Sequence, residues 1–232
     1  MPLRLVVLDA MGVIYTDGDD VRSPLMPFVQ ARGCGLSYDE IEEHYEPYVV
    51  GHCTAREFWK RLGIDVSAHP KIDDEYVRLY KLTPGLREFL VGMQQRKIPV
   101  ACLSNDAAGW ATKRRRLFDL ESLIKPWVIS GEVGERKPSQ EIFYQLLVRT
   151  RRNPEDCLFV DDRVSNLDAA RELGFQTAHF HPAIEDDPGT HECVESFEEL
   201  AEVVLAARDR IAPPEGARPI FMELWDKGGK VE

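Results

Sequence analysis

Four short apolar runs in this chain each lead into a polar side chain that can take part in chemistry. The first run, Leu5 to Leu8, is followed by Asp9, and Gly12 comes shortly after it. The other polar groups that follow such runs are Ser104 after residues 100–103, Lys137 in the loop after residues 127–129, and Asp161 and Asp162 after residues 158–160. Groups at the carboxyl ends of strands in an open parallel sheet share one crevice. The pattern therefore predicts a fold in which a carboxylate, a hydroxyl, a cation and an acidic pair converge.

Helical patterns alternate with β-rich runs along the chain, as they do in repeating βαβ units. The β-rich runs cover residues 5–8, 100–103, 127–129, 158–160 and 176–180. Apolar residues recur at helical spacing between them, as in Leu86, Phe89 and Met93. Ser196 and Glu199 have the spacing of a capping box that opens a further helix. The sequence therefore predicts the α/β class, with a Rossmann-like, doubly wound parallel sheet as its core.

The segment over residues 16–83 interrupts this alternation, because it contains helical signals but no β-rich run. Two Ser/Thr-x-x-Glu sequences within it have capping-box spacing. We therefore expect an α/β core formed by residues 1–15 and 84–212, with an inserted α-helical cap over residues 16–83. The remaining residues, 213–232, would form a C-terminal tail whose aromatic side chains pack on the core or on a second subunit. A monomer and a homodimer both stay open.

The order of these motifs resembles that of the haloacid dehalogenase-like (HAD) hydrolase superfamily, which has a strand with Asp, a strand with Ser or Thr, a Lys, and a strand with Asp-Asp. The resemblance spans residues 1 to about 200. The helical insertion is similar to the cap of helical-cap subfamily I, and the chain looks like the branch that contains sugar 1-phosphate phosphatases. A cap of this kind closes over the crevice, excludes water and sets substrate choice.

The resemblance implies a phosphatase that hydrolyses a small phosphorylated metabolite. Asp9 would be the nucleophile that forms an aspartyl-phosphate, which divides the hydrolysis into two steps. Ser104 and the adjacent Asn105 would hold phosphate oxygens. Lys137 would offset charge on Asp9 and on the phosphoryl group, and Asp161 would orient Lys137 or a metal-bound water.

The resemblance also implies a Mg²⁺ cofactor. Its ligands would be one oxygen of Asp9, the main-chain carbonyl of Met11 and the carboxylate of Asp162, with waters and substrate completing the octahedral shell. Most phosphatases of the superfamily carry a second Asp where this chain has Met11. Because that ligand is a main-chain oxygen, the substitution need not remove the metal.

Met11 leaves open how the leaving group receives its proton. The usual Asp protonates the leaving group and then activates water, and a thioether can do neither. Three interpretations follow. The substrate has a good leaving group, as in sugar 1-phosphates or acyl phosphates; another residue, for which His52 is a candidate, supplies the proton; or the protein is a catalytically impaired phosphosugar-binding protein.

Two other activities share parts of this pattern. The metal-independent 2-haloacid dehalogenases share Asp-Ala-x-Gly, but they carry Tyr at the position of Met11 and lack the acidic pair. That pair would repel a carboxylate substrate unless a cation intervened. Phosphonoacetaldehyde hydrolase uses a lysine of its insertion as a Schiff base, and this insertion offers Lys60, Lys71 and Lys81.

Charge and composition exclude several functional classes. The net charge of −11 would repel a phosphate backbone, so nucleic acid is not an expected partner. No stretch approaches the roughly 18 apolar residues of a membrane span, and the apolar run near the N-terminus is too short for a signal peptide. Five cysteines without a Cys-x-x-Cys pair indicate a reducing compartment, and we expect a cytoplasmic protein whose partner is a small-molecule substrate.

Overall fold

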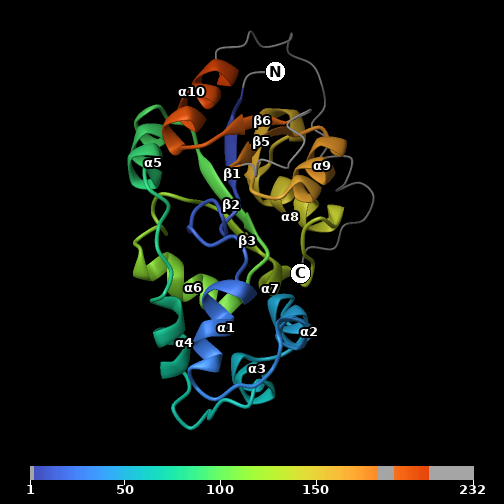
Figure 1. The fold of residues 1–232 in the computed structure, drawn as a ribbon. Coiled ribbons are helices and arrows are strands. Elements are labelled where there is room, and N and C mark those ends of the chain that lie inside the picture. The colour runs from blue at the N-terminus through green and yellow to red at the C-terminus, as the bar shows by residue number, and fades with distance from the viewer. Residues whose placement is uncertain (1–2, 182–190, 209–232) are drawn as a thin grey trace.

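A six-stranded sheet forms the centre of the fold (Figure 1). The structure, a computed structural model, describes residues 3–181 and 191–208, so the predicted tail over residues 213–232 lies outside the described residues. The strand order is β3-β2-β1-β4-β5-β6, and every neighbouring pair is parallel. The strands are β1 Leu5–Leu8, β2 Val100–Ser104, β3 Trp127–Ile129, β4 Cys157–Asp161, β5 Gln176–Phe180 and β6 Glu192–Val194. The order reverses between β1 and β4, which confirms the predicted doubly wound sheet.

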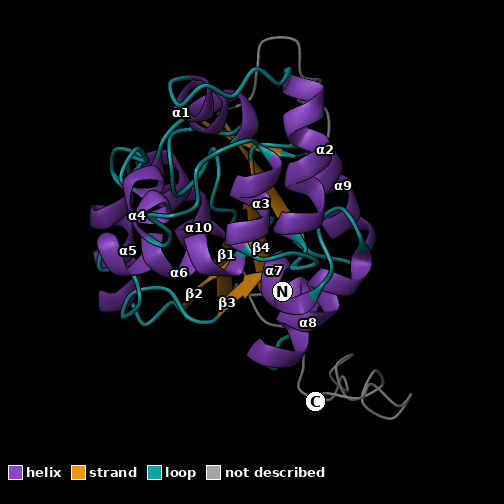
Figure 2. Cartoon of the chain, turned by 90° about the horizontal axis from the view of Figure 1, so that it is seen from below, coloured by secondary structure: helices purple, strands orange, loops and turns teal. Residues whose placement is uncertain are grey.

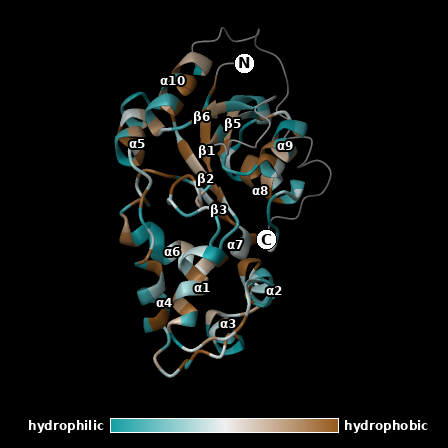
Figure 3. Ribbon diagram, viewed as in Figure 1, coloured by the Kyte–Doolittle hydropathy of each residue, from teal (hydrophilic) through white to brown (hydrophobic). Residues whose placement is uncertain are grey.

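The five predicted strands agree with the structure to within one residue at each end, whereas the sequence does not predict β6. Strands β1 to β4 are buried along their whole length, and the hydropathy colouring shows them as largely hydrophobic (Figure 3). In β6, Glu192 and Cys193 are exposed. An edge strand of this kind has no apolar run, so its sequence resembles that of a loop.

Helices cover both faces of the sheet. Alternate residues of β1 join two different hydrophobic clusters, one on each face. In Figure 1, α5 and α10 lie on one side of the strands, and α8 and α9 lie on the other. No helix within residues 3–181 and 191–208 combines the length and the apolar composition of a membrane span. The helices outside the segment between residues 16 and 83 are α5 Leu86–Gln95, α6 Ala108–Leu117, α7 Ser130–Val133, α8 Gln140–Thr150, the short η2 Pro154–Asp156, α9 Val164–Glu172 and α10 Phe197–Arg208.

A layer of helices follows β1 in the sequence and lies across one end of the sheet (Figures 1 and 2). The two chain segments that join this layer to the core run side by side, because Thr16 N–H donates to the Lys81 carbonyl at 3.1 Å and Thr83 N–H donates to the Ile14 carbonyl at 3.0 Å. Both capping boxes predicted within residues 16–83 are present, at the starts of α2 and α3. The elements of this helical layer are η1 Val21–Leu25, α1 Met26–Gln30, α2 Tyr38–Val49, α3 Ala55–Arg61 and α4 Lys71–Val77.

Trp110 of α6 joins the helical layer to the core. Its side chain is fully buried, and its indole N–H donates to Asp73 Oδ1 of α4 at 3.0 Å. The aromatic rings around it all belong to the helical layer, with ring centroids 4.4 to 6.4 Å from that of Trp110: Tyr45, Tyr48, Phe58, Trp59 and Tyr76. The apolar residues of the layer and of one face of the sheet therefore form one continuous hydrophobic cluster.

Candidate functional site

The predicted polar groups meet at the carboxyl ends of the strands, between the sheet and the helical layer. Leu8 pairs with Val160 in the sheet register, so Asp9 and Asp161 follow side by side. A cavity of about 90 Å³ lies at this edge. Its wall on the core side includes Asp9, Met11, Asn105, Lys137 and Asn166. This is the position where open α/β sheets bind ligands, next to the point at which the strand order reverses.

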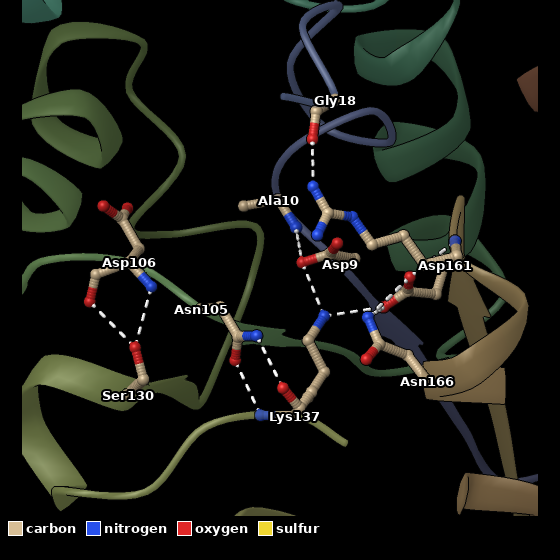
Figure 4. Close-up of polar contacts among 10 residues, drawn as sticks. Asp9, Ala10, Gly18, Asn105, Asp106, Ser130, Lys137, Asp161 and Asn166 are labelled. Carbon is tan, nitrogen blue, oxygen red and sulfur yellow. Dashed lines mark hydrogen bonds and ion pairs between the residues drawn. The ribbon is translucent and has the colours of Figure 1, made fainter. Parts of the chain in front are cut away.

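Lys137 connects the two carboxylates (Figure 4). Its ammonium lies 2.7 Å from Asp9 Oδ1 and 2.6 Å from Asp161 Oδ2, and the residue is 1% exposed. Burial lowers the pKa of Lys137, but the charges of Asp161 and Asp9 outweigh burial and raise this pKa above its ordinary value. Lys137 is therefore a fixed positive charge beside the predicted nucleophile.

Asn105 holds the loop that carries Lys137. Its side-chain amide N–H donates to the Lys137 carbonyl at 2.9 Å, and the Lys137 N–H donates to Asn105 Oδ1 at 2.7 Å (Figure 4). The nitrogen and the oxygen of the Asn105 side-chain amide are thus both hydrogen-bonded to the main chain of Lys137. Asn105 lines the cavity as predicted, but its side chain fixes the lysine loop, so a contact with phosphate would fall to other atoms of the residue.

Asp161 is held in place by three residues. Asn166 Nδ2 lies 3.0 and 3.1 Å from its two oxygens, and the Arg163 main-chain N–H donates to Oδ1 at 2.9 Å. Together with Lys137, these contacts occupy the carboxylate and are consistent with the predicted role of orienting Lys137. Asn166 and Arg163 are additions to the sequence-based site. A sequence feature that could have indicated Asn166 is its position in the first turn of the helix that follows the Asp-Asp pair.

Asp9, Asp161 and Asp162 form a cluster whose ligand atoms all lie within 4.8 Å of one another. Burial is the largest cause that raises the pKa of Asp9 above its usual range, with Asp161 and Asp162 adding to it and Lys137 opposing it. Burial and the neighbouring Asp161 raise the pKa of Asp162 to about 7. Lys137 and the nearby Arg163 guanidinium oppose three carboxylates here, so negative charges still outnumber positive charges in the cluster.

The acidic cluster fits a hard divalent cation. Asp162 Oδ1 is buried and has no hydrogen-bond partner among the residues that the structure describes. Carboxylate oxygens are the ligands that Mg²⁺ prefers. A buried carboxylate oxygen without a partner is costly, and a cation at this point would satisfy it.

Two glycines allow the loop after β1 to lie against Asp162. Gly12 has a φ of +74°, and a Cβ atom built on it would lie 2.2 Å from Asp162 Oδ2. A Cβ atom on Gly18 would lie 2.4 Å from the same oxygen. The Gly18 carbonyl also accepts a hydrogen bond from the Arg163 guanidinium at 3.0 Å. Side chains at either glycine would therefore displace the Asp162 carboxylate.

The structure does not bring every predicted residue to the cavity wall. Ser104 is fully buried at the end of β2, outside the cavity wall, and its hydroxyl has no hydrogen-bond partner within the described residues. Its contact with phosphate stays a prediction. Met11 is 6% exposed and lines the cavity, so a thioether does stand beside Asp9. His52 is exposed and lies outside the cavity wall, so the structure does not support it as the proton donor.

The fold and the site together define a HAD-like hydrolase. A family model described as haloacid dehalogenase-like hydrolase matches residues 3–174 of the chain. The chain belongs to this family.

Individual relatives are similar to parts of the chain. The phosphorylated carbohydrates phosphatase of Thermotoga maritima is 30% identical over 101 residues, which are 44% of this chain and 47% of that protein. The drimenol cyclase drtB of Aspergillus calidoustus is 42% identical over 196 residues, which cover 77% of this chain and 34% of that protein. The chain spans less than half the length of both curated relatives.

Solved structures share the fold. A HAD phosphatase from Thermococcus onnurineus has a TM-score of 0.67 at 16% identity, over 88% of this chain and 98% of that one. A HAD family enzyme from Bacteroides thetaiotaomicron, in complex with magnesium and inorganic phosphate, has a TM-score of 0.62 at 21% identity, over 81% of this chain and 98% of that one. At these identities the likeness establishes the fold alone.

Proposed function

We propose that this HAD-like hydrolase is a Mg²⁺-dependent phosphatase that acts on a small phosphorylated carbohydrate. The observation that supports this best is the Lys137 ammonium between Asp9 and Asp161, beside the unpaired oxygen of Asp162. The Thermotoga maritima relative is named for phosphorylated carbohydrates, which agrees with this substrate class. The five cysteines of the chain are all free, as expected for the cytoplasmic location that we propose.

The chemistry would begin with Asp9. One of its oxygens attacks phosphorus, the P–O bond to the leaving oxygen breaks, and an aspartyl-phosphate forms, while the leaving oxygen takes a proton from solvent. Water then attacks phosphorus, loses a proton to solvent, and the bond from phosphorus to Asp9 breaks to release inorganic phosphate. Lys137 lowers the pKa of Asp9 against the effect of burial, which favours the ionised nucleophile, and it balances charge on the phosphoryl oxygens, while Asp161 holds Lys137 in place. Mg²⁺ held by Asp9, Asp162 and the Met11 carbonyl would supply further positive charge to the phosphoryl group.

Two alternatives fit the structure less well. A 2-haloacid dehalogenase would have to place a carboxylate substrate beside Asp161 and Asp162, where like charges repel it. A Schiff-base enzyme would need a lysine of the helical layer at the cavity, but Lys60, Lys71 and Lys81 are all exposed and lie outside its wall.

Release of inorganic phosphate from a library of phosphorylated metabolites tests the proposal. We expect turnover of sugar phosphates with Mg²⁺, and a loss of at least about 10²-fold when EDTA removes the metal. Release of chloride from 2-chloropropionate without metal would establish the dehalogenase instead. Tight binding of sugar phosphates without phosphate release at any pH would establish the phosphosugar-binding protein.

Met11→Asp tests whether the native enzyme depends on a good leaving group. We expect the wild type to prefer glucose 1-phosphate over glucose 6-phosphate, because an anomeric oxygen leaves more readily than an ordinary alkoxide. The added carboxyl would supply the missing proton and raise the rate with glucose 6-phosphate by about 10²-fold. Met11→Asn is the matched control, since it is polar but cannot donate a carboxyl proton. Equal rates of the wild type with both sugars would contradict the bias.

A further inference from the structure

The helical layer contributes its own wall to the cavity, and that wall is acidic. One face of α2 points inward, with Tyr38, Glu42, Tyr45, Glu46 and Val49 spaced three and four residues apart. The segment before η1 adds Asp19 and Asp20. No cationic side chain of the helical layer is among the residues that line this cavity.

Three of the four carboxylates on this wall already have partners. Asp20 accepts hydrogen bonds from the hydroxyls of Tyr45 and Tyr80, both at 2.8 Å. Asp19 accepts one from the Tyr38 hydroxyl at 3.2 Å. Glu46 is paired with Arg136.

Glu42 is different from these three. It is half-buried, it lines the cavity, and it makes no hydrogen bond or ion pair with any residue in the described part of the chain. Its carboxylate is therefore available to a ligand.

The cations that line the cavity are also already engaged. Lys137 lies between Asp9 and Asp161, and Arg136 is paired with Glu46. Arg163 donates to the Gly18 carbonyl, and the nearby charges of Asp162, Asp9 and Asp161 raise its pKa, so its charge is directed at the acidic cluster. A phosphoryl group at Asp9 would draw on Lys137 and on the metal. A second anionic group on the same substrate would then face the carboxylate of Glu42.

We propose that Glu42 is a specificity-determining residue that selects substrates whose leaving group is neutral and rich in hydroxyls. This rests on the proposed phosphatase function and narrows its substrate class. Hydroxyl groups donate to a carboxylate in charge-assisted hydrogen bonds, whereas a carboxylate or a second phosphate on the leaving group is repelled by it. Glu42 thus favours simple sugar or polyol phosphates over bisphosphates and phosphorylated acids.

Glu42→Lys tests this with Glu43→Lys as a matched control, because Glu43 is the next residue of α2 and is exposed outside the cavity wall. The measured quantity is kcat/KM for glucose 1-phosphate divided by kcat/KM for phosphoglycolate, whose leaving group carries a carboxylate. Comparing this ratio between variants cancels the intrinsic reactivity of the two esters. We expect Glu42→Lys to lower the ratio by at least about tenfold and Glu43→Lys to leave it unchanged.

An unchanged ratio in Glu42→Lys, or an equal fall in both variants, would overturn the role of Glu42 while leaving the phosphatase intact. Absence of phosphate release from every substrate would instead overturn the proposed function. In that case the same comparison is made by calorimetry, with Kd values of glucose 1-phosphate and phosphoglycolate for the wild type and both variants. A tenfold change in their ratio confined to Glu42→Lys would still support the selection.

Discussion

Asp9→Asn is expected to abolish phosphate release while leaving the protein folded. An amide cannot attack phosphorus to form the covalent intermediate, so kcat should fall by at least about 10⁴-fold. The substitution keeps the size of the side chain, and an amide oxygen can still accept from the Ala10 N–H, which donates to Asp9 Oδ1 at 2.6 Å. Single-turnover phosphate release and thermal unfolding in the same buffer measure the two effects.

The pKa of Asp9 predicts the direction of the stability change. Burial raises this pKa in the folded protein, against the pull of Lys137, so the fold favours the neutral carboxyl. The stability that comes from the neutral form is present at low pH and is lost as pH rises through the folded pKa. At neutral pH without metal, a neutral Asn should therefore leave Tm unchanged or raise it, since Lys137 keeps its pair with Asp161.

Asp39→Asn is the matched control, because Asp39 is an exposed carboxylate in the first turn of α2, outside the cavity wall. It should retain full activity. Substantial turnover by Asp9→Asn, or a large fall in its Tm, would mean that Asp9 is a structural residue and that the nucleophile lies elsewhere.

The sequence predicts the sheet and the strand-end groups well because they follow from local patterns. Each inner strand is short, apolar and fully buried, and each lies directly before or near the polar residue that it positions. The parallel register then brings Asp9 and Asp161 together without further information. The exposed edge strand β6 lacks such a pattern.

The surroundings of these groups depend on contacts between residues far apart in the sequence, which no local pattern encodes. Asn105 holds the main chain of Lys137 across 32 positions, and Arg163 reaches the Gly18 carbonyl across 145. The sequence does not predict the role of the acidic face of α2 either, because the charged side of a helix usually faces solvent. Its role becomes visible only when the fold places that face over Asp9.

If residues 16–83 form a cap that is a separate domain, as predicted, the cap and the α/β core should unfold independently. Substitution of Trp110 tests this. Trp110 belongs to the core helix α6, yet its ring packs among aromatic side chains of the helical layer. Arg114, one turn later, is also fully buried, with Asp106 as its ion-pair partner and the Tyr80 ring 4.2 Å away. The aromatic side chains of the layer thus pack on one another and on Trp110, so α6 completes the hydrophobic core of the layer.

Trp110→Ala should therefore destabilise the whole protein by about 3–5 kcal/mol, the usual cost of truncating a large buried aromatic side chain. Trp110→Phe keeps most of the ring packing and loses the hydrogen bond to Asp73, so it should cost about 1 kcal/mol. Leu117→Ala is the matched control on the same helix, because Leu117 is 43% exposed, and its effect should stay within about 0.5 kcal/mol. Urea unfolding followed by tryptophan fluorescence and by far-UV circular dichroism measures all three.

The shape of the unfolding transition decides whether the helical layer is a separate domain. Because one hydrophobic cluster runs through the layer and one face of the sheet, Trp110→Ala should shift a single transition that both probes report together. If the helical layer were an independent domain, it would unfold at a lower urea concentration than the core in Trp110→Ala. Circular dichroism would then show a second transition, for the core, with its midpoint unchanged from the wild type. In the first case the helical layer cannot separate from α6 without exposing the hydrophobic cluster that they share.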